Sequence, residues 1–345
     1  MSDEKMNVAP QLIVSAAPHL RTTDSVERVM YSVVIAMLPA LAGSVYFFGW
    51  RALWVTAIAV VTAVLTEAAV QKFRKVQITA LDGSAIVVGM LLAFNLPPSV
   101  PWWLPVAGTF FAIAIGKHVF GGLGMNPMNP ALLGRAFLMA SWPVYMTTGW
   151  SVAQDGATTT SGIAAVTGAT PLATVKAAMA NLAAGVDVEQ SRAIIEAANT
   201  AETYLSLFIG SVGGCIGETS VLLLLVGAAY LFYKKYINYR IPLSFIGSVA
   251  IVAWIFGGEG YFTGDFIFHI LTGGLVLGAF FMATDMVTSP SAPLGQWIFG
   301  AGCGFLTIFI RLAGGYPEGV CYSILLMNLV TPLLDRYTQP KIFGA

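Results

Sequence analysis

The chain has 345 residues, of which 57% are hydrophobic and only 10% are charged. Its 17 lysines and arginines are balanced by 17 aspartates and glutamates, so the formal net charge is zero. Soluble proteins carry about 25% charged residues, and this composition therefore excludes an ordinary soluble domain. A mean hydropathy of +0.77 indicates a polytopic membrane protein.

Ten apolar segments have about the length of a transmembrane helix, which needs roughly 17 to 25 residues to cross about 30 Å of hydrocarbon. They predict an all-α polytopic membrane protein with about ten transmembrane helices. We expect the sixth segment to begin with a broken turn. In chain order the segments are residues 29–48, 52–70, 81–96, 102–120, 129–146, 205–232, 241–257, 265–284, 296–312 and 318–334.

Five segments precede a long polar stretch and five follow it, so the two halves cross the membrane with opposite polarity. This arrangement suggests an inverted repeat of two five-helix halves. A weak echo between residues 128–135 and 327–336 fits either a repeat or chance. The predicted organisation is a cytoplasmic N-terminal segment (1–28), a first transmembrane half (29–146), an external segment (147–204), a second transmembrane half (205–334) and a cytoplasmic tail (335–345).

Basic residues orient the bundle, because cytoplasmic connections carry an excess of lysine and arginine. With the N-terminus inside, the inner segments hold twelve basic residues and the outer segments hold four. We therefore expect both termini in the cytoplasm and the polar stretch outside. The inner residues are Lys5, Arg21, Arg28, Lys72, Arg74, Lys75, Lys117, Lys234, Lys235, Arg240, Arg336 and Lys341, and the outer ones are Arg51, Lys176, Arg192 and Arg311.

The polar stretch contains Thr170 directly before Pro171, followed by an alanine-rich run and then Gly185. This pattern is typical of a helix N-cap, a proline at the first helical position and a glycine stop. The same turn favours a bound phosphate, because free N–H groups and the positive end of the helix dipole meet there. Gly168 and Ala169 would let a bulky group approach the backbone closely.

Ionisable side chains in or beside apolar segments are costly in a bilayer, so each is a functional candidate. Glu67 lies near a cytoplasmic end beside Lys72, where it either snorkels to the interface or takes part in ion movement. Arg135 lies inside the fifth segment. We expect it to pair with a carboxylate or with helix carbonyls in the bundle interior.

Glu218 is the sharper candidate, because it follows three glycines at the expected helix break. Freed carbonyls and one acid could hold a cation there, and the alternatives are a pair with an arginine or a capping role. Asp285 and Glu318, expected at opposite faces, are further candidates for ion coupling. No metal site is expected, because the cysteines and histidines lack ligand spacing: Cys215, Cys303, Cys321, His19, His118 and His269.

Six segments in order resemble one family, the D subunits of bacterial Rnf complexes, and more distantly the B subunits of sodium-pumping NADH:quinone oxidoreductases. Rnf complexes are ion-translocating electron-transfer complexes of the bacterial membrane. The segments are Ala17-Pro18-His19-Leu20-Arg21 with Asp24-Ser25, Gly124-Met125-Asn126-Pro127-Met128-Asn129-Pro130-Ala131, Thr167-Gly168-Ala169-Thr170-Pro171-Leu172, Gly217-Glu218-Thr219-Ser220, Ala283-Thr284-Asp285-Met286-Val287-Thr288-Ser289-Pro290 and Gly314-Gly315-Tyr316-Pro317-Glu318-Gly319-Val320.

The resemblance implies an FMN joined through its phosphate to Thr170, with Thr167, Gly168, Ala169 and Pro171 around it. It also implies a second, non-covalent flavin, riboflavin, in the membrane part. The family motif usually carries an aspartate a few residues upstream, where this chain has apolar residues 163–166. The missing aspartate leaves open how efficiently FMN is attached, but it does not change the expected attachment residue, Thr170.

The resemblance further implies a subunit that works only inside a multi-subunit oxidoreductase of the bacterial cytoplasmic membrane. Its partners would be the A, B, C, E and G subunits, a flavin transferase and the lipid bilayer, and no nucleic acid. Electron flow between ferredoxin and NAD would drive sodium ions or protons. Two alternatives remain. One is a small-solute channel or transporter with an inverted repeat, and the other is a structural anchor for redox subunits. Covalent flavin on the chain would favour the electron-transfer subunit over both alternatives.

The predicted sidedness can be tested by labelling. A cysteine placed near Asp187 should react with a membrane-impermeant thiol reagent in intact spheroplasts, and one placed near Arg74 should not, because the basic residues gather inside. The reverse labelling pattern would place the polar segment in the cytoplasm.

Overall fold

The computed structural model describes residues 24–147, 170–218, 220–258, 260–316 and 318–339. Every regular element in these ranges is a helix, which confirms the predicted all-α class. The elements are α1 (Val26–Phe48), α2 (Trp50–Phe73), α3 (Ser84–Phe94), α4 (Trp103–Phe111), η1 (Ala112–His118), α5 (Pro130–Ser141), α6 (Pro143–Thr147), α7 (Pro171–Ala184), α8 (Val188–Ala198), α9 (Ala201–Ile209), η2 (Ile216–Glu218), α10 (Val221–Tyr233), α11 (Arg240–Phe256), α12 (Phe266–Leu271), α13 (Leu275–Leu277), η3 (Gly278–Met282), α14 (Pro293–Ala313) and α15 (Val320–Tyr337).

All ten predicted apolar segments fall on helices, but within the described ranges only α1, α2 and α14 are both long and apolar enough to cross a membrane unaided. The apolar helices α3, α10 and α11 are shorter. Several other segments are assembled from two or three helical pieces. The bundle therefore contains discontinuous helices, as transporter-like membrane folds do.

Three helix breaks have local causes. The break expected in the sixth segment is confirmed, since α9 ends at Gly210, whose φ is 113°, and α10 begins at Val221. The predicted continuity of 129–146 is wrong, because Trp142 leaves the helical conformation before Pro143, which lacks an N–H donor. The predicted continuity of 265–284 is also wrong, because Gly273 and Gly274 adopt φ values of 68° and 63° between α12 and α13.

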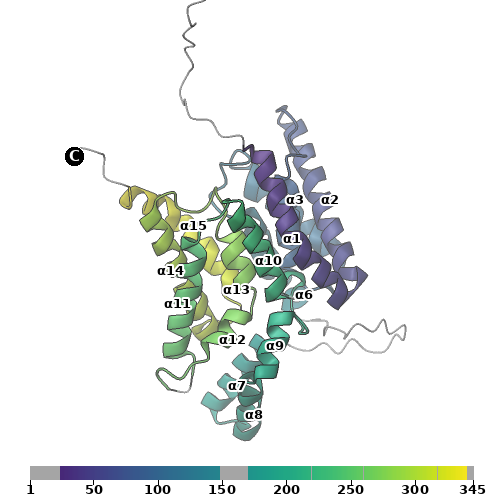
Figure 1. The fold of residues 1–345 in the computed structure, drawn as a ribbon. Coiled ribbons are helices and arrows are strands. Elements are labelled where there is room, and N and C mark those ends of the chain that lie inside the picture. Colours follow the sequence, from purple (N-terminus) through teal and green to yellow (C-terminus); the bar gives the residue numbers. More distant parts are fainter. Residues whose placement is uncertain (1–23, 148–169, 219, 259, 317, 340–345) are drawn as a thin grey trace, which may run out of the picture.

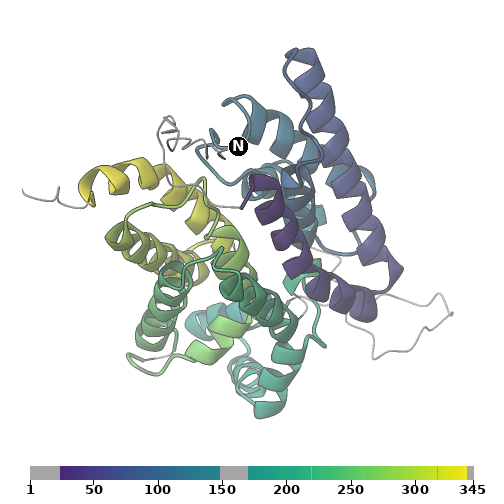
Figure 2. The ribbon, with the colours of Figure 1, turned by 45° about the horizontal axis from the view of Figure 1, so that its top comes forward.

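The two halves of the chain lie beside one another, with the first half in purple to blue and the second in green to yellow (Figures 1 and 2). Helix α1 packs against α10, and α11 packs against α14. Small residues bring these backbones together: a Cβ added at Gly227 would collide with the carbonyl oxygen of Ala36. The interior between the halves is one apolar cluster that includes Met37, Phe94 and Phe281.

The sequence echo between the halves does not mark equivalent positions. Asn129 caps the start of α5, whereas Asn328 lies in the middle of α15. Pro130 occupies the first turn of α5, and Pro332 lies inside α15. The inverted relationship of the halves stays a prediction that this echo does not support.

Helices α7, α8 and α9 project from one end of the bundle, whereas α1 begins and α15 ends at the opposite end (Figure 1). Which side of the membrane each end of the bundle faces stays a prediction. The predicted helix after Thr170 is confirmed, since α7 runs from Pro171 to Ala184 and Gly185 follows with φ 70°. Leu172 and Val175 of α7 pack against Leu207 of α9 and Phe268 of α12.

Candidate functional site

Thr170 is the N-cap residue of α7. Its hydroxyl oxygen accepts a hydrogen bond from the Ala173 N–H at 3.3 Å, and the residue is 6% exposed. The helix-cap interpretation is therefore confirmed, and the covalent attachment stays a prediction. Pro171 occupies the first position of α7, while Thr167, Gly168 and Ala169 lie outside the described residues.

Two cavities meet at Thr170. The first, which we call the Arg135 cavity, has a volume of about 540 Å³ counted to its open side. The second, the Glu218 cavity, has a volume of about 360 Å³, also counted to its open side. The Arg135 cavity is lined by Arg135, Ala136, Met139, Met146, Thr147, Thr170, Ala173, Tyr316, Glu318, Cys321 and Tyr322, and the Glu218 cavity by Thr170, Pro171, Leu172, Leu207, Val212, Gly213, Gly214, Glu218, Leu271, Thr272, Gly273 and Glu318.

A buried ion pair closes the Arg135 cavity. Arg135 of α5 donates through Nη2 to Oε2 of Glu318 and through Nη1 to Oδ1 of Asn95 at 2.8 Å. Arg135 is 4% exposed and Glu318 is 8% exposed. The expected pairing of Arg135 with a carboxylate is thus confirmed. The Nε of Arg135 is buried with no hydrogen-bond partner in the part of the chain that the structure describes.

Glu218 lies in η2, inside the predicted helix break, and shares its cavity with Thr170. It forms no ion pair with any described residue, and the positive charges of Arg135 and Arg311 act on it through space. The sequence placed Glu218 in the membrane part, away from the flavin motif. The fold brings the two to one site.

One group of side chains has metal-ligand chemistry, although no metal was expected. Single ligand atoms of Cys215, Glu218 and Glu318 lie within 4.8 Å of one another. The Arg135 guanidinium sits on Glu318 at this point and supplies the positive charge. Arg135 therefore compensates Glu318, and Glu218 is the carboxylate of this group that forms no ion pair with a described residue.

The break between α12 and α13 requires glycine for two reasons. Both glycines have left-handed backbone angles, which side-chain-bearing residues rarely adopt. A Cβ at Gly273 would also lie 2.6 Å from Nη2 of Arg311, and one at Gly274 would lie 2.7 Å from Oε1 of Glu218. The glycines thus let an arginine and a glutamate reach the break together.

Arg311, which the sequence predicts among the external charges, is buried in the bundle beside α7, and its side of the membrane stays a prediction. The residue is 2% exposed in the last turn of α14. Its guanidinium donates to the carbonyl oxygens of His269 at 2.5 Å and Thr272 at 2.8 Å. These carbonyls end α12, so the positive charge lies at the negative end of a short helix.

Lys176 and Tyr204 anchor α7 and α9 to the rest of the bundle through hydrogen bonds. Lys176 of α7 donates to the carbonyl oxygens of Gly314 and, at 2.9 Å, Tyr316, and its burial lowers the pKa of the ammonium. Tyr204 of α9 donates to Oδ2 of Asp265 at 2.6 Å, and burial together with this hydrogen bond raises the pKa of Tyr204 to about 12. Both contacts position the segment around Thr170.

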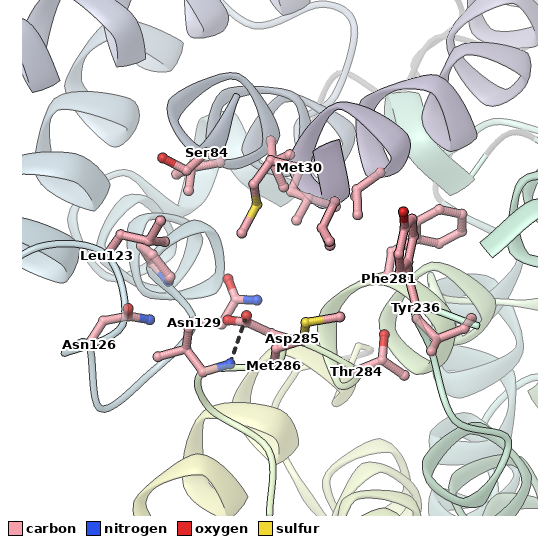
Figure 3. A pocket seen from close by; sticks show the side chains of 18 of the residues that line it. Met30, Ser84, Leu123, Asn126, Asn129, Tyr236, Phe281, Thr284, Asp285 and Met286 are labelled. Atoms are coloured by element: carbon pink, nitrogen blue, oxygen red, sulfur yellow. Dashed lines mark hydrogen bonds between the residues drawn. The ribbon is translucent and has the colours of Figure 1, made fainter. Parts of the chain in front are cut away.

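A third cavity, the Asp285 cavity, lies between α1, α3 and two loops that carry family-like motifs (Figure 3). Its volume is about 830 Å³ counted to its open side. Asn126 and Asn129 come from one loop and Asp285 from the other. The carboxylate of Asp285 accepts hydrogen bonds from the N–H of Val287 and the hydroxyl of Thr288, both at 3.3 Å.

Glu67 is paired inside the protein, so the expectation that it snorkels beside Lys72 is wrong. Both its oxygens lie 2.7 Å from Nζ of Lys117, which also donates to Ser84 at 2.7 Å. Glu67 and Lys117 are each 1% exposed. Lys117, counted from the sequence among the cytoplasmic loop charges, is fully buried and borders the Asp285 cavity.

Comparison with known proteins identifies the family. Residues 13–344 match the NQR2, RnfD, RnfE family, and the chain belongs to it. It is 51% identical to the D subunit of the proton-translocating ferredoxin:NAD(+) oxidoreductase complex of Clostridium ljungdahlii, over 96% of each chain. It is 49% identical to the Na(+)-translocating counterpart of Acetobacterium woodii, over 96% of this chain and 95% of that one. The D subunit of the ion-translocating oxidoreductase complex of Citrobacter koseri is 35% identical, over 96% of this chain and 98% of that one.

The buried pair of Glu67 and Lys117 predicts a stability effect. Lys117→Met should destabilise the protein by about 3–5 kcal/mol, because it leaves a buried carboxylate without its counter-charge. The double variant with Glu67→Gln should recover most of that loss. Thermal unfolding of the purified protein in detergent measures both, and a single variant as stable as the double one would contradict the prediction.

Proposed function

We propose that the chain is the D subunit of an ion-translocating ferredoxin:NAD oxidoreductase of the bacterial cytoplasmic membrane. Family membership and three relatives with such names over almost the full length support this. The A, B, C, E and G subunits of the Rnf complex are its partners, and it is not active alone. Both termini face the cytoplasm and α7 the outside. The relatives' names favour this function over a solute transporter.

The single observation that carries a flavin role is the environment of Thr170. Its hydroxyl lies at the N-terminus of α7, where free N–H groups stabilise a phosphate. A cavity with a buried arginine opens beside it. FMN esterified to Thr170 would supply a group that exchanges one or two electrons. The ester oxygen could still accept from the Ala173 N–H, so the cap and the attachment are compatible.

The protein's own residues then bind and orient the flavin. The walls of the Arg135 cavity would surround the flavin, and the tether would hold it beside Thr170. A riboflavin is proposed for the Asp285 cavity, which combines apolar walls from Met30 and Phe281 with polar groups from Ser84 and Asn126. This cavity lies in the transmembrane part, where the family resemblance implies the second flavin.

Glu218 is the proposed ion-coupling residue. The break before Glu218 places residues 213–214 in its cavity, and a broken helix is where transporters place cations. Glu67 is already neutralised by Lys117, and Asp285 is held by local hydrogen bonds. They are second candidates for ion coupling for that reason.

Thr170→Val should abolish covalent flavin while the protein still inserts, because it removes the ester oxygen and keeps the shape of the side chain. Helix α7 should lose about 1 kcal/mol with its cap. In-gel ultraviolet fluorescence of the denatured chain, purified from its native host so that the flavin transferase is present, measures attachment. Thr167→Val is the control and should stay fluorescent. Fluorescence that persists after the Thr170 change would remove the proposal.

Glu218→Gln should keep the covalent flavin and lose most ion-dependent electron transfer, since it removes the charge and preserves size and hydrogen bonding. The assembled complex would be assayed for electron transfer at varied sodium concentration and pH. Rates and ion dependence equal to those of the parent would return Glu218 to a structural role. Glu67 and Asp285 would then be tested next.

A further inference from the structure

The Arg135 cavity has walls that suit a planar aromatic group. Tyr316 and Tyr322 stack with ring centroids 5.6 Å apart and an interplanar angle of 28°. Met139 and Met146 line the same space. Methionine sulfur and tyrosine faces both make favourable contacts with flat rings. Thr170 borders this cavity directly, so a group tethered to its hydroxyl can enter it.

The end of the cavity is charged, and its two charges oppose one another. Arg135 and Glu318 form a buried pair, so a ligand in the cavity meets one positive and one negative group at close range. Interactions between charges are strong where water is excluded. The Nε of Arg135 is a buried donor that the described part of the protein leaves unsatisfied, and it points to an acceptor or anion as the missing neighbour.

We propose that the isoalloxazine ring of the flavin on Thr170 docks in the Arg135 cavity, and that the Arg135 and Glu318 pair sets its reduction potential. This rests on the proposed attachment at Thr170. An electron from a reduced iron–sulfur protein of the ferredoxin class adds one negative charge to the ring. Arg135 stabilises that charge and Glu318 destabilises it, so the two side chains act with opposite signs.

The opposite signs make the test sharp. Spectroelectrochemical titration of the assembled complex gives the midpoint potential of the covalent flavin. Glu318→Gln should favour the reduced flavin at least tenfold, a rise of about 59 mV for a one-electron step. Arg135→Gln should lower the potential by a similar amount. The double variant should return towards the parent, and Arg135→Lys should keep most of the parent's potential.

A matched control removes a carboxylate that lies far from the cavity. Asp335 lies near the other end of α15, and 17 residues at 1.5 Å each place it about 25 Å from Glu318. Asp335→Asn should leave the flavin potential unchanged. If Arg135→Gln fails to assemble, Glu318→Gln, Arg135→Lys and the double variant still decide, because the double variant removes both members of the pair while Arg311 continues to act on Glu218.

Fluorescence of the denatured chain is recorded for every variant, so attachment and potential are separate readouts. A parent chain without covalent flavin would overturn the proposed function. A fluorescent chain whose potential does not move, or moves in the same direction for Glu318→Gln and Arg135→Gln, would overturn the docking proposal alone. Opposite shifts with recovery in the double variant would establish it.

Discussion

Buried charge in a lipid environment must be compensated where it lies, and this constraint organises the protein. Glu67 is matched by Lys117, and Glu318 by Arg135. Arg311 is matched by the carbonyl ends of α12. Each compensation joins elements distant in sequence, such as α5 with the loop before α15. Each buried pair therefore holds its two elements together, and the packing of these elements in turn holds the pair away from water.

Helix breaks determine where these charges meet. A continuous helix satisfies its own carbonyls, whereas the breaks after α9 and α12 free backbone groups inside the bundle. Gly273 and Gly274 leave room for Arg311 and Glu218 at one of these breaks. Because Thr170, at the start of α7, lines one cavity with Gly273 and Glu218, a group attached there would border the charged interior of the bundle. The flavin proposed for Thr170 would therefore lie beside Glu218, the residue proposed for ion coupling.

The sequence predicted local features well and distant contacts poorly. Thr170, Pro171 and Gly185 carry their own capping chemistry, so α7 was predicted to its ends. The pairing of Glu67 with Lys117 joins residues fifty positions apart, and no local pattern reports such a contact. Lys117 was counted as a loop charge because hydropathy places charges at span ends. The break at 272–274 had a local signal, the Gly273-Gly274 pair. The signal was outweighed because the apolar segment 265–284 has the length of one continuous transmembrane helix.

Overall similarity to relatives does not identify a coupled ion, whereas the number of free oxygens at the proposed site would. Relatives at 51% and 49% identity are named for protons and for sodium, respectively. A proton needs one carboxylate oxygen, whereas a bare cation needs several oxygens at once. Arg311 occupies the Thr272 carbonyl and lies 3.4 Å from that of Gly273, which withdraws both from the Glu218 cavity. At the proposed Glu218 site, ion selection would therefore depend on how firmly Arg311 is held, and not on Glu218 alone.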